Sequence, residues 1–98
     1  MLVHTVLFWL KPDLTKAQLR LFDQGVRRLT TIQSIRQGFV GRPAATDRPV
    51  IDRTYSYGLT ILCDNLAAHD TYQADPIHQQ FLAECGSFWS RVQIYDAE

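Results

Sequence analysis

Residues 2–10 form an apolar run rich in β-branched and aromatic side chains, which ends at a lysine and a proline. This pattern is typical of a strand that a proline terminates. Successive side chains of a strand point to opposite faces. We therefore expect His4 and Phe8 to lie on one face of a sheet, with Leu7 and Trp9 on the other.

The pattern then changes from strand to helix. From Lys16 to Leu29, apolar residues recur three and four positions apart, which is the period of a helix with one buried face. Thr15 precedes this stretch, and Gln18 follows three residues later, so the two can form a capping box. The sequence predicts a helix from Lys16 to about Leu29.

The rest of the chain alternates between strand and helix signals. Residues 42–53 contain two prolines and alternating charges, which indicates a loop. The expected strands are 36–41, 54–63 and 90–96, and the expected helices are 65–72 and 76–84. The order βαββαβ predicts one α+β domain over residues 1–98, with a ferredoxin-like four-stranded antiparallel sheet and helices on one face.

The sheet is predicted to be apolar on both faces. Leu7, Trp9, Leu62 and Tyr95 fall on the side away from the helices, and an uncovered apolar face usually marks an interface. We therefore expect a homodimer in which two sheets pack face to face as a dimeric α+β barrel. The predicted core between sheet and helices is Phe8, Phe22, Val26, Leu59, Ile61, Phe81, Trp89, Val92 and Ile94.

Composition excludes several partners. Ten basic and ten acidic residues cancel and are interspersed, so no nucleic-acid partner is expected. The apolar run at residues 2–10 is too short to cross a bilayer and has no basic leader, so no membrane partner is expected. Cys63 and Cys85 lack the spacing of metal ligands and are interpreted as free thiols, which favours a cytoplasmic location.

Residues 72–81 carry the strongest candidate chemistry. Asp75 is a good helix cap and Pro76 suits the first helical position, so a new helix is expected to start there. Tyr72 and His78 then stand on either side of the break. We interpret His78 as a general base and Tyr72 as a hydrogen-bond donor to a carbonyl. The competing interpretation is a half-buried aromatic beside a helix-start histidine.

Other residues are expected to line the same pocket. His4 and Tyr57 would supply polar groups, although a hydrogen-bonded core histidine and cross-strand packing are the competing interpretations. The apolar wall would come from Phe22, Phe81 and Trp89. His4, His78 and Asp75 are good ligand types, but no spacing supports a metal site, so neither metal nor other cofactor is expected.

Four segments together resemble one known family. They are His4 to Lys11, the strand between Gly38 and Gly41, residues 72–81, and residues 88–96. In this order they are similar to the stress-responsive dimeric α/β-barrel (Dabb) family. The resemblance implies a ferredoxin-like protomer in a homodimer. One such protein, the plant polyketide cyclase that makes olivetolic acid, closes a poly-β-keto thioester by an aldol step with a Tyr and a His and no metal.

The resemblance places Tyr72 and His78 at the two catalytic positions of that cyclase, and His4 and Trp89 in its pocket. Asp75 and Tyr57 stand where the family pattern and the cyclase have histidines, so a different substrate is expected. The leading hypothesis is a homodimer that binds a small carbonyl compound and performs cyclase- or lyase-like proton transfer. The alternatives are a non-catalytic ligand-binding dimer and, by fold analogy alone, a cofactor-free monooxygenase.

Overall fold

The structure is a computed structural model that describes residues 1–98. Its strands and helices follow the predicted βαββαβ order, with the second helical region divided in two. The elements are β1 (Leu2–Leu10), α1 (Lys16–Arg28), a short 3-10 helix (Leu29–Thr31), β2 (Gln37–Gly41), β3 (Tyr57–Cys63), α2 (Leu66–Ala74), α3 (Pro76–Cys85) and β4 (Trp89–Ala97).

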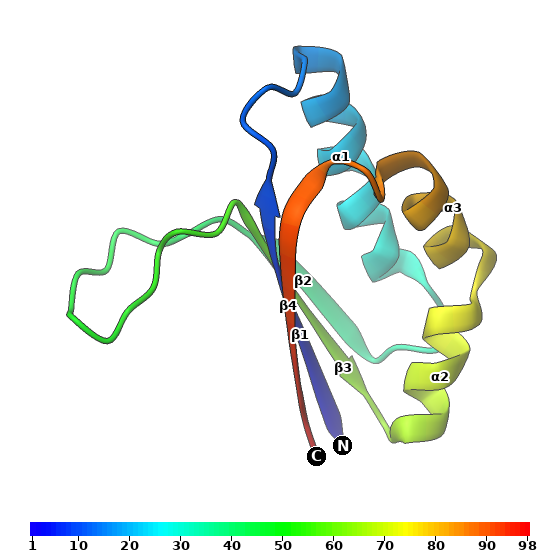
Figure 1. The fold of residues 1–98 in the computed structure, drawn as a ribbon. Coiled ribbons are helices and arrows are strands. Elements are labelled where there is room, and N and C mark those ends of the chain that lie inside the picture. The colour runs from blue at the N-terminus through cyan, green and yellow to red at the C-terminus, as the bar shows by residue number, and fades with distance from the viewer.

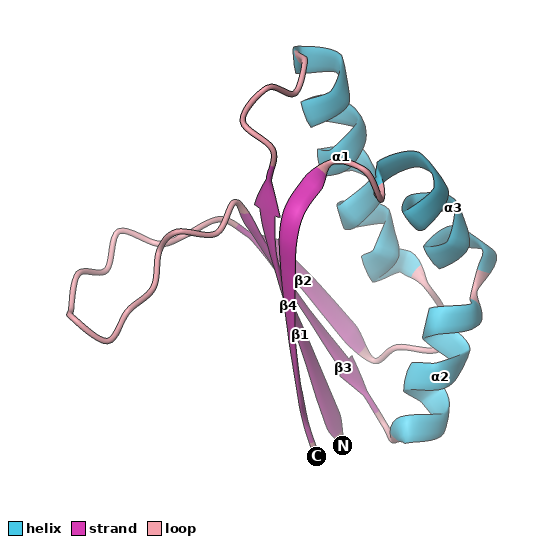
Figure 2. Cartoon of the chain, in the orientation of Figure 1, coloured by secondary structure: helices cyan, strands magenta, loops and turns pink.

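The four strands form one antiparallel sheet in the order β2-β3-β1-β4, as in ferredoxin-like proteins. The three α-helices cover one face of this sheet, and the opposite face carries no helix (Figure 1, Figure 2). The predicted fold class is therefore confirmed. His4 on β1 lies opposite Ile61 on β3 and opposite Asp96 on β4. Its side chain therefore neighbours residues of both adjacent strands.

Side chains set the start of each helix. Thr15 and Gln18 form the predicted capping box at α1, with each side chain bonded to the other residue's backbone N–H. The side chain of Asn65 accepts from Ala68 N and caps α2. Asp75 ends α2 and caps α3, since its Oδ1 accepts from Ile77 N at 2.8 Å. One aspartate therefore fixes the break between these helices.

The core between helices and sheet contains most of the predicted residues. Phe8, Phe22, Val26, Leu59, Ile61 and Phe81 are buried, and Trp89 packs against them half-buried. The prediction was wrong for Val92 and Ile94, whose exposed fractions are 39% and 45%. Both lie on the helix-facing side of β4, but β4 is an edge strand and the helices pack closest over β2 and β3.

The face without helices carries exposed aromatic side chains. Phe39 on β2 is 68% exposed and Tyr95 on β4 is 61% exposed, with half-buried Leu7 and Trp9 between them. The β2–β3 loop, residues 42–56, projects from the sheet on this side, away from the helices (Figure 1). None of the helices combines the length and apolar character needed to cross a membrane.

The third strand begins later than predicted. The sequence placed its start at Thr54, whereas β3 begins at Tyr57. Thr54 instead bonds back to Asp52, whose Oδ1 accepts from both the N–H and the hydroxyl of Thr54. The hydroxyl also accepts from Trp9 Nε1 at 2.9 Å. These local bonds hold the base of the loop against β1 and keep it outside the sheet ladder.

Candidate functional site

A cavity of about 230 Å³ opens between the helix-facing side of the sheet and the helices α2 and α3. Ten of its thirteen lining residues are hydrophobic. The lining consists of His4, Val6, Phe8, Leu29, Leu59, Tyr72, Gln73, His78, Phe81, Leu82, Trp89, Val92 and Ile94. A second hollow between α1 and α3 holds only about 30 Å³, which is the space of a single water molecule.

The break between α2 and α3 brings Tyr72 and His78 together. Tyr72 lies in the last turn of α2 and His78 in the first turn of α3. Their ring centroids are 5.0 Å apart, with the ring planes at 77° to one another. Asp75 sets this geometry because it ends one helix and caps the next. The predicted pair is therefore close in space and borders one cavity.

Both members of the pair have buried polar atoms without partners. The hydroxyl of Tyr72 and Nδ1 of His78 are inaccessible to solvent and make no hydrogen bond. Leaving a buried polar group unpaired costs about 1–3 kcal/mol, and native proteins rarely tolerate it without a reason. Two such atoms beside one mostly apolar cavity are the features expected of a site that a ligand's polar group completes.

Burial shifts the pKa values of the two residues in opposite directions, and both shifts favour the uncharged form. Desolvation lowers the pKa of His78, and the nearby His4 and His69 lower it further, while Asp75 opposes the shift. His78 is therefore neutral at pH 7 and keeps a nitrogen lone pair. Burial raises the pKa of Tyr72 well above its ordinary value, so its hydroxyl keeps its proton. The pair thus combines a proton acceptor with a hydrogen-bond donor.

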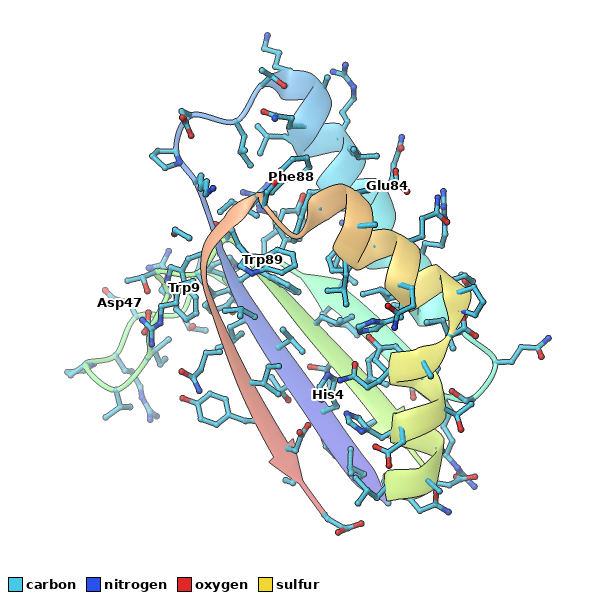
Figure 3. All side chains as sticks on the ribbon, turned by 45° about the vertical axis from the view of Figure 1, so that its right-hand side comes forward. His4, Trp9, Asp47, Glu84, Phe88 and Trp89 are labelled. Atoms are coloured by element: carbon cyan, nitrogen blue, oxygen red, sulfur yellow. The ribbon has the colours of Figure 1, made fainter.

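His4 lies on the helix-facing side of β1, where it lines the cavity (Figure 3). The residue is only 2% exposed, and its Nδ1 donates to Asp96 Oδ1 at 2.5 Å. Its ring meets that of Tyr72 edge-on, with centroids 6.0 Å apart. The structure therefore combines both interpretations of His4, which is a hydrogen-bonded core histidine and also part of the cavity wall.

The remaining predicted residues divide into two groups. Phe81 and Trp89 line the cavity and stack with their centroids 5.8 Å apart. Phe22 and Tyr57 do not line it. Phe22 is fully buried in the core, where its ring meets that of Tyr57. The hydroxyl of Tyr57 donates to Asp23 at 2.8 Å, away from Tyr72 and His78.

His69 was not recognised in the sequence. It lies on α2 three residues before Tyr72, so both share one face of the helix. Its ring centroid is 4.8 Å from that of His4. One potential ligand atom each from His4, His69 and Asp96 lies within 4.8 Å of the others. The set that the sequence suggested, His4 with His78 and Asp75, is not the one that the fold assembles.

Comparisons with known proteins agree with this architecture. The family model described as "Stress responsive A/B Barrel Domain" matches residues 2–98. None of the curated proteins matches the chain.

Three solved structures illustrate the similarity in fold. A Dabb family protein with a ferredoxin-like fold from Mesorhizobium loti has a TM-score of 0.77 at 22% identity, covering 99% of this chain and 94% of that one. A dimeric ferredoxin-like protein of unknown function from Thermobifida fusca has a TM-score of 0.77 at 18% identity, with coverages of 98% and 88%. A hydroxynitrile lyase from Passiflora edulis has a TM-score of 0.76 at 15% identity, with coverages of 98% and 90%.

Proposed function

We propose that this chain, which belongs to the stress-responsive A/B barrel domain (Dabb) family, binds a small carbonyl compound and moves a proton on it. His78 removes a proton from the carbon next to the carbonyl, and Tyr72 donates a hydrogen bond to the carbonyl oxygen. The observation that carries the proposal is the pair of buried, unpartnered polar atoms, Tyr72 Oη and His78 Nδ1, beside one apolar cavity.

The cavity limits the ligand to a small and largely apolar molecule. A protein cavity of about 150 Å³ lined by aliphatic and aromatic side chains can hold benzene, so 230 Å³ suits a ligand with one ring or a short chain. The stacked rings of Phe81 and Trp89 offer flat apolar surface to such a body. Because the polar groups lie at the Tyr72–His78 wall, the carbonyl would face that wall.

The proposed reaction begins with enolisation. The lone pair on His78 takes the α-proton, the electrons of the C–H bond move toward the carbonyl, and negative charge develops on its oxygen. A protonated Tyr72 stabilises that charge by hydrogen bonding, and its raised pKa keeps the proton on the phenol. Return of the proton elsewhere gives an isomer, and attack of the enolate on a second carbonyl gives a cyclised product.

The same proposal includes a homodimer, with a second copy of the chain covering the face that has no helices. Exposed Phe39 and Tyr95 on that face support it, as does the similar Thermobifida fusca structure, which is described as dimeric. Two buried free cysteines fit a reducing compartment, so we place the protein in the cytoplasm.

Exchange of α-protons for deuterium tests the proposal without knowledge of the natural substrate. The wild-type protein is incubated in D₂O with a panel of small enolisable ketones and β-diketones, and exchange is followed by NMR. His78→Ala should lower the catalysed rate by roughly 100-fold or more, which is the range for loss of a general base. Gln80→Ala is the matched control, because Gln80 is exposed on the same helix and does not line the cavity.

The outcomes separate the competing functions. An unchanged exchange rate in His78→Ala would remove the acid–base proposal. Saturable ligand binding without exchange, weakened by the same substitution, would indicate a non-catalytic binding protein. Oxygen consumption with a quinol-like substrate would instead support the monooxygenase alternative. Circular dichroism and light scattering on each variant establish that the fold and the oligomeric state are intact.

A further inference from the structure

We propose that His4, His69 and Asp96 form a binding site for one divalent first-row transition-metal ion, with Zn²⁺ as the representative case. One potential ligand atom from each of the three residues lies within 4.8 Å of the others. The residues come from β1, α2 and β4, so tertiary folding alone brings them together. Two imidazoles and one carboxylate are a donor set that zinc and iron sites use in proteins.

The state of His69 is the strongest evidence for a ligand. The residue is 8% exposed, and its Nε2 is buried without a hydrogen-bond partner. Its other ring nitrogen, Nδ1, lies 3.2 Å from Asp70 Oδ1. If Nδ1 carries the proton and donates to Asp70, Nε2 presents a lone pair. Metal-binding histidines commonly have such an outer carboxylate, which fixes the tautomer and aims the free nitrogen at the ion.

The sheet register supplies the other two ligands. His4 and Asp96 are directly opposite in the β1–β4 ladder and already form a hydrogen bond of 2.5 Å. Ligand atoms around a tetrahedral ion with bonds of about 2.0–2.2 Å lie roughly 3.3–3.5 Å apart. The His4–Asp96 pair must therefore open slightly, and His69 must move closer. The Asp96 side chain is 44% exposed and free to make this adjustment.

The metal site is distinct from the proposed acid–base pair, although His4 belongs to the metal-binding set and also lines the cavity beside that pair. His69 and Asp96 do not line the cavity, and neither Tyr72 nor His78 belongs to the metal-binding set. With three protein ligands, the fourth position of a tetrahedral ion would hold water. The set lies on the helix-facing side of the sheet, so each chain should bind one ion without any contribution from a partner.

Titration of the metal-free protein with ZnCl₂ in a calorimeter tests this inference, after treatment with a chelator and its removal. The expected result is one ion per chain. His69→Ala should weaken binding more than 100-fold, since losing an outer carboxylate alone typically costs 10- to 100-fold. Asp70→Asn, which removes the outer carboxylate, should weaken it by about 10- to 100-fold. Gln80→Ala is the control, because Gln80 is exposed and lies outside the metal-binding set; its affinity should be within about twofold of wild type, and circular dichroism confirms that each variant is folded.

Co²⁺ provides an independent readout of the ligands. A site with nitrogen and oxygen donors should show the visible d–d bands of tetrahedral or five-coordinate Co²⁺ without the near-ultraviolet charge-transfer band of a cysteine thiolate. Equal Zn²⁺ affinity in wild type and a folded His69→Ala variant would overturn the site, as would a thiolate band or the absence of binding. Because the readout is binding, its failure leaves the deuterium-exchange test of His78 unaffected.

Discussion

Tyr72 is the residue at which the proposed function and stability are most clearly opposed. Its side chain is completely buried, yet its hydroxyl has no hydrogen-bond partner. Removing the hydroxyl should therefore relieve a desolvation cost in the ligand-free protein. We expect Tyr72→Phe to raise the free energy of unfolding by about 1 kcal/mol, measured by urea denaturation, while it lowers α-proton exchange at least tenfold.

Opposite signs for stability and activity would identify Tyr72 as a residue held for chemistry. A loss of stability in Tyr72→Phe would mean that the hydroxyl is already hydrogen-bonded in solution, which would contradict the proposed site. Phe81→Leu is a useful comparison, because Phe81 lines the same cavity without a polar atom. That variant should lose stability through reduced packing, and it should not reproduce the pattern of Tyr72→Phe.

Cys85 should make the protein sensitive to alkali. Burial, followed by the charge of Glu84, raises the pKa of its thiol from 9.0 to about 11. Between these values the unfolded chain releases the thiol proton while the folded chain retains it. The contribution of the Cys85 thiol to the free energy of unfolding is therefore fully present below pH 9. It falls as the pH rises, and the loss reaches roughly 2 kcal/mol at pH 11.

Urea denaturation at pH 7, 9 and 10 measures this effect. Cys85→Ala should lose less stability between pH 7 and pH 10 than wild type does, although its stability at pH 7 should be lower because the substitution removes a buried side chain. Burial also raises the pKa values of Cys63 and Tyr72, so part of the alkaline loss should remain in the variant. Identical pH dependence in both proteins would exclude a contribution from Cys85.

At the scale of elements, the break between α2 and α3 determines how the residues of the candidate site are arranged. Asp75 ends the first helix and caps the second, and Tyr72 and His78 lie three residues to either side. Asp75→Ala removes the hydrogen bond to Ile77 N and should lower the free energy of unfolding by about 1 kcal/mol. Urea midpoints measure this loss, and deuterium exchange should slow as the two rings lose their fixed separation.

Asp75→Asn is the matched variant, since asparagine caps helices about as well as aspartate but carries no charge. It should retain most of the stability and most of the exchange activity. Equal losses in the alanine and asparagine variants would assign the effect to the charge of Asp75 rather than to its cap. The charge does act on His78, whose pKa it raises against the larger effect of burial.

The sequence was sufficient for features that depend on nearby residues. Caps and periodicity predicted every α-helix and strand, and the Asp75-Pro76 signal correctly indicated that Tyr72 and His78 come together. One feature that depends on distant segments was missed, namely the surroundings of His69. The environment of His69 arises because α2 crosses β1 where His4 faces Asp96 of β4. The spacing of residues along the sequence does not indicate that these three elements meet.

The exposure of residues at the sheet edge was also mispredicted, because it depends on the position of helices that are distant in the sequence. Alternation correctly placed Val92 and Ile94 on the helix-facing side, but it carries no information about how far the helices extend. Because β4 is an edge strand, both residues remain substantially exposed beside the cavity. The terminal residues of β3 were also misassigned, since Thr54 bonds to Asp52 and Trp9 rather than joining the ladder.

At the scale of the whole molecule, the face without helices should decide the oligomeric state. We expect the wild-type protein to sediment at twice the chain mass of 11.3 kDa at micromolar concentration. Tyr95→Asp should convert it to a monomer, because burying an unpaired carboxylate in an apolar interface is strongly unfavourable. Analytical ultracentrifugation measures both species.

Leu66→Asp provides the control for that experiment. Leu66 is 53% exposed, lies on α2 on the opposite side of the molecule, and begins its helix, where an acidic side chain is tolerated. This variant should remain dimeric. A well-folded wild-type monomer at micromolar concentration would contradict the proposed assembly and would leave Phe39 and Tyr95 without an explanation.

The long β2–β3 loop divides the chain at a point where the backbone can be cut. Its tip is exposed, while its base is held by Trp9. Cleavage there would give one piece with β1, α1 and β2 and another with β3, α2, α3 and β4. All three strand pairings of the sheet connect one piece with the other, since β3 pairs with β1 and β2, and β1 pairs with β4. Nicked protein should therefore stay assembled, and the separate halves should reconstitute it by fragment complementation.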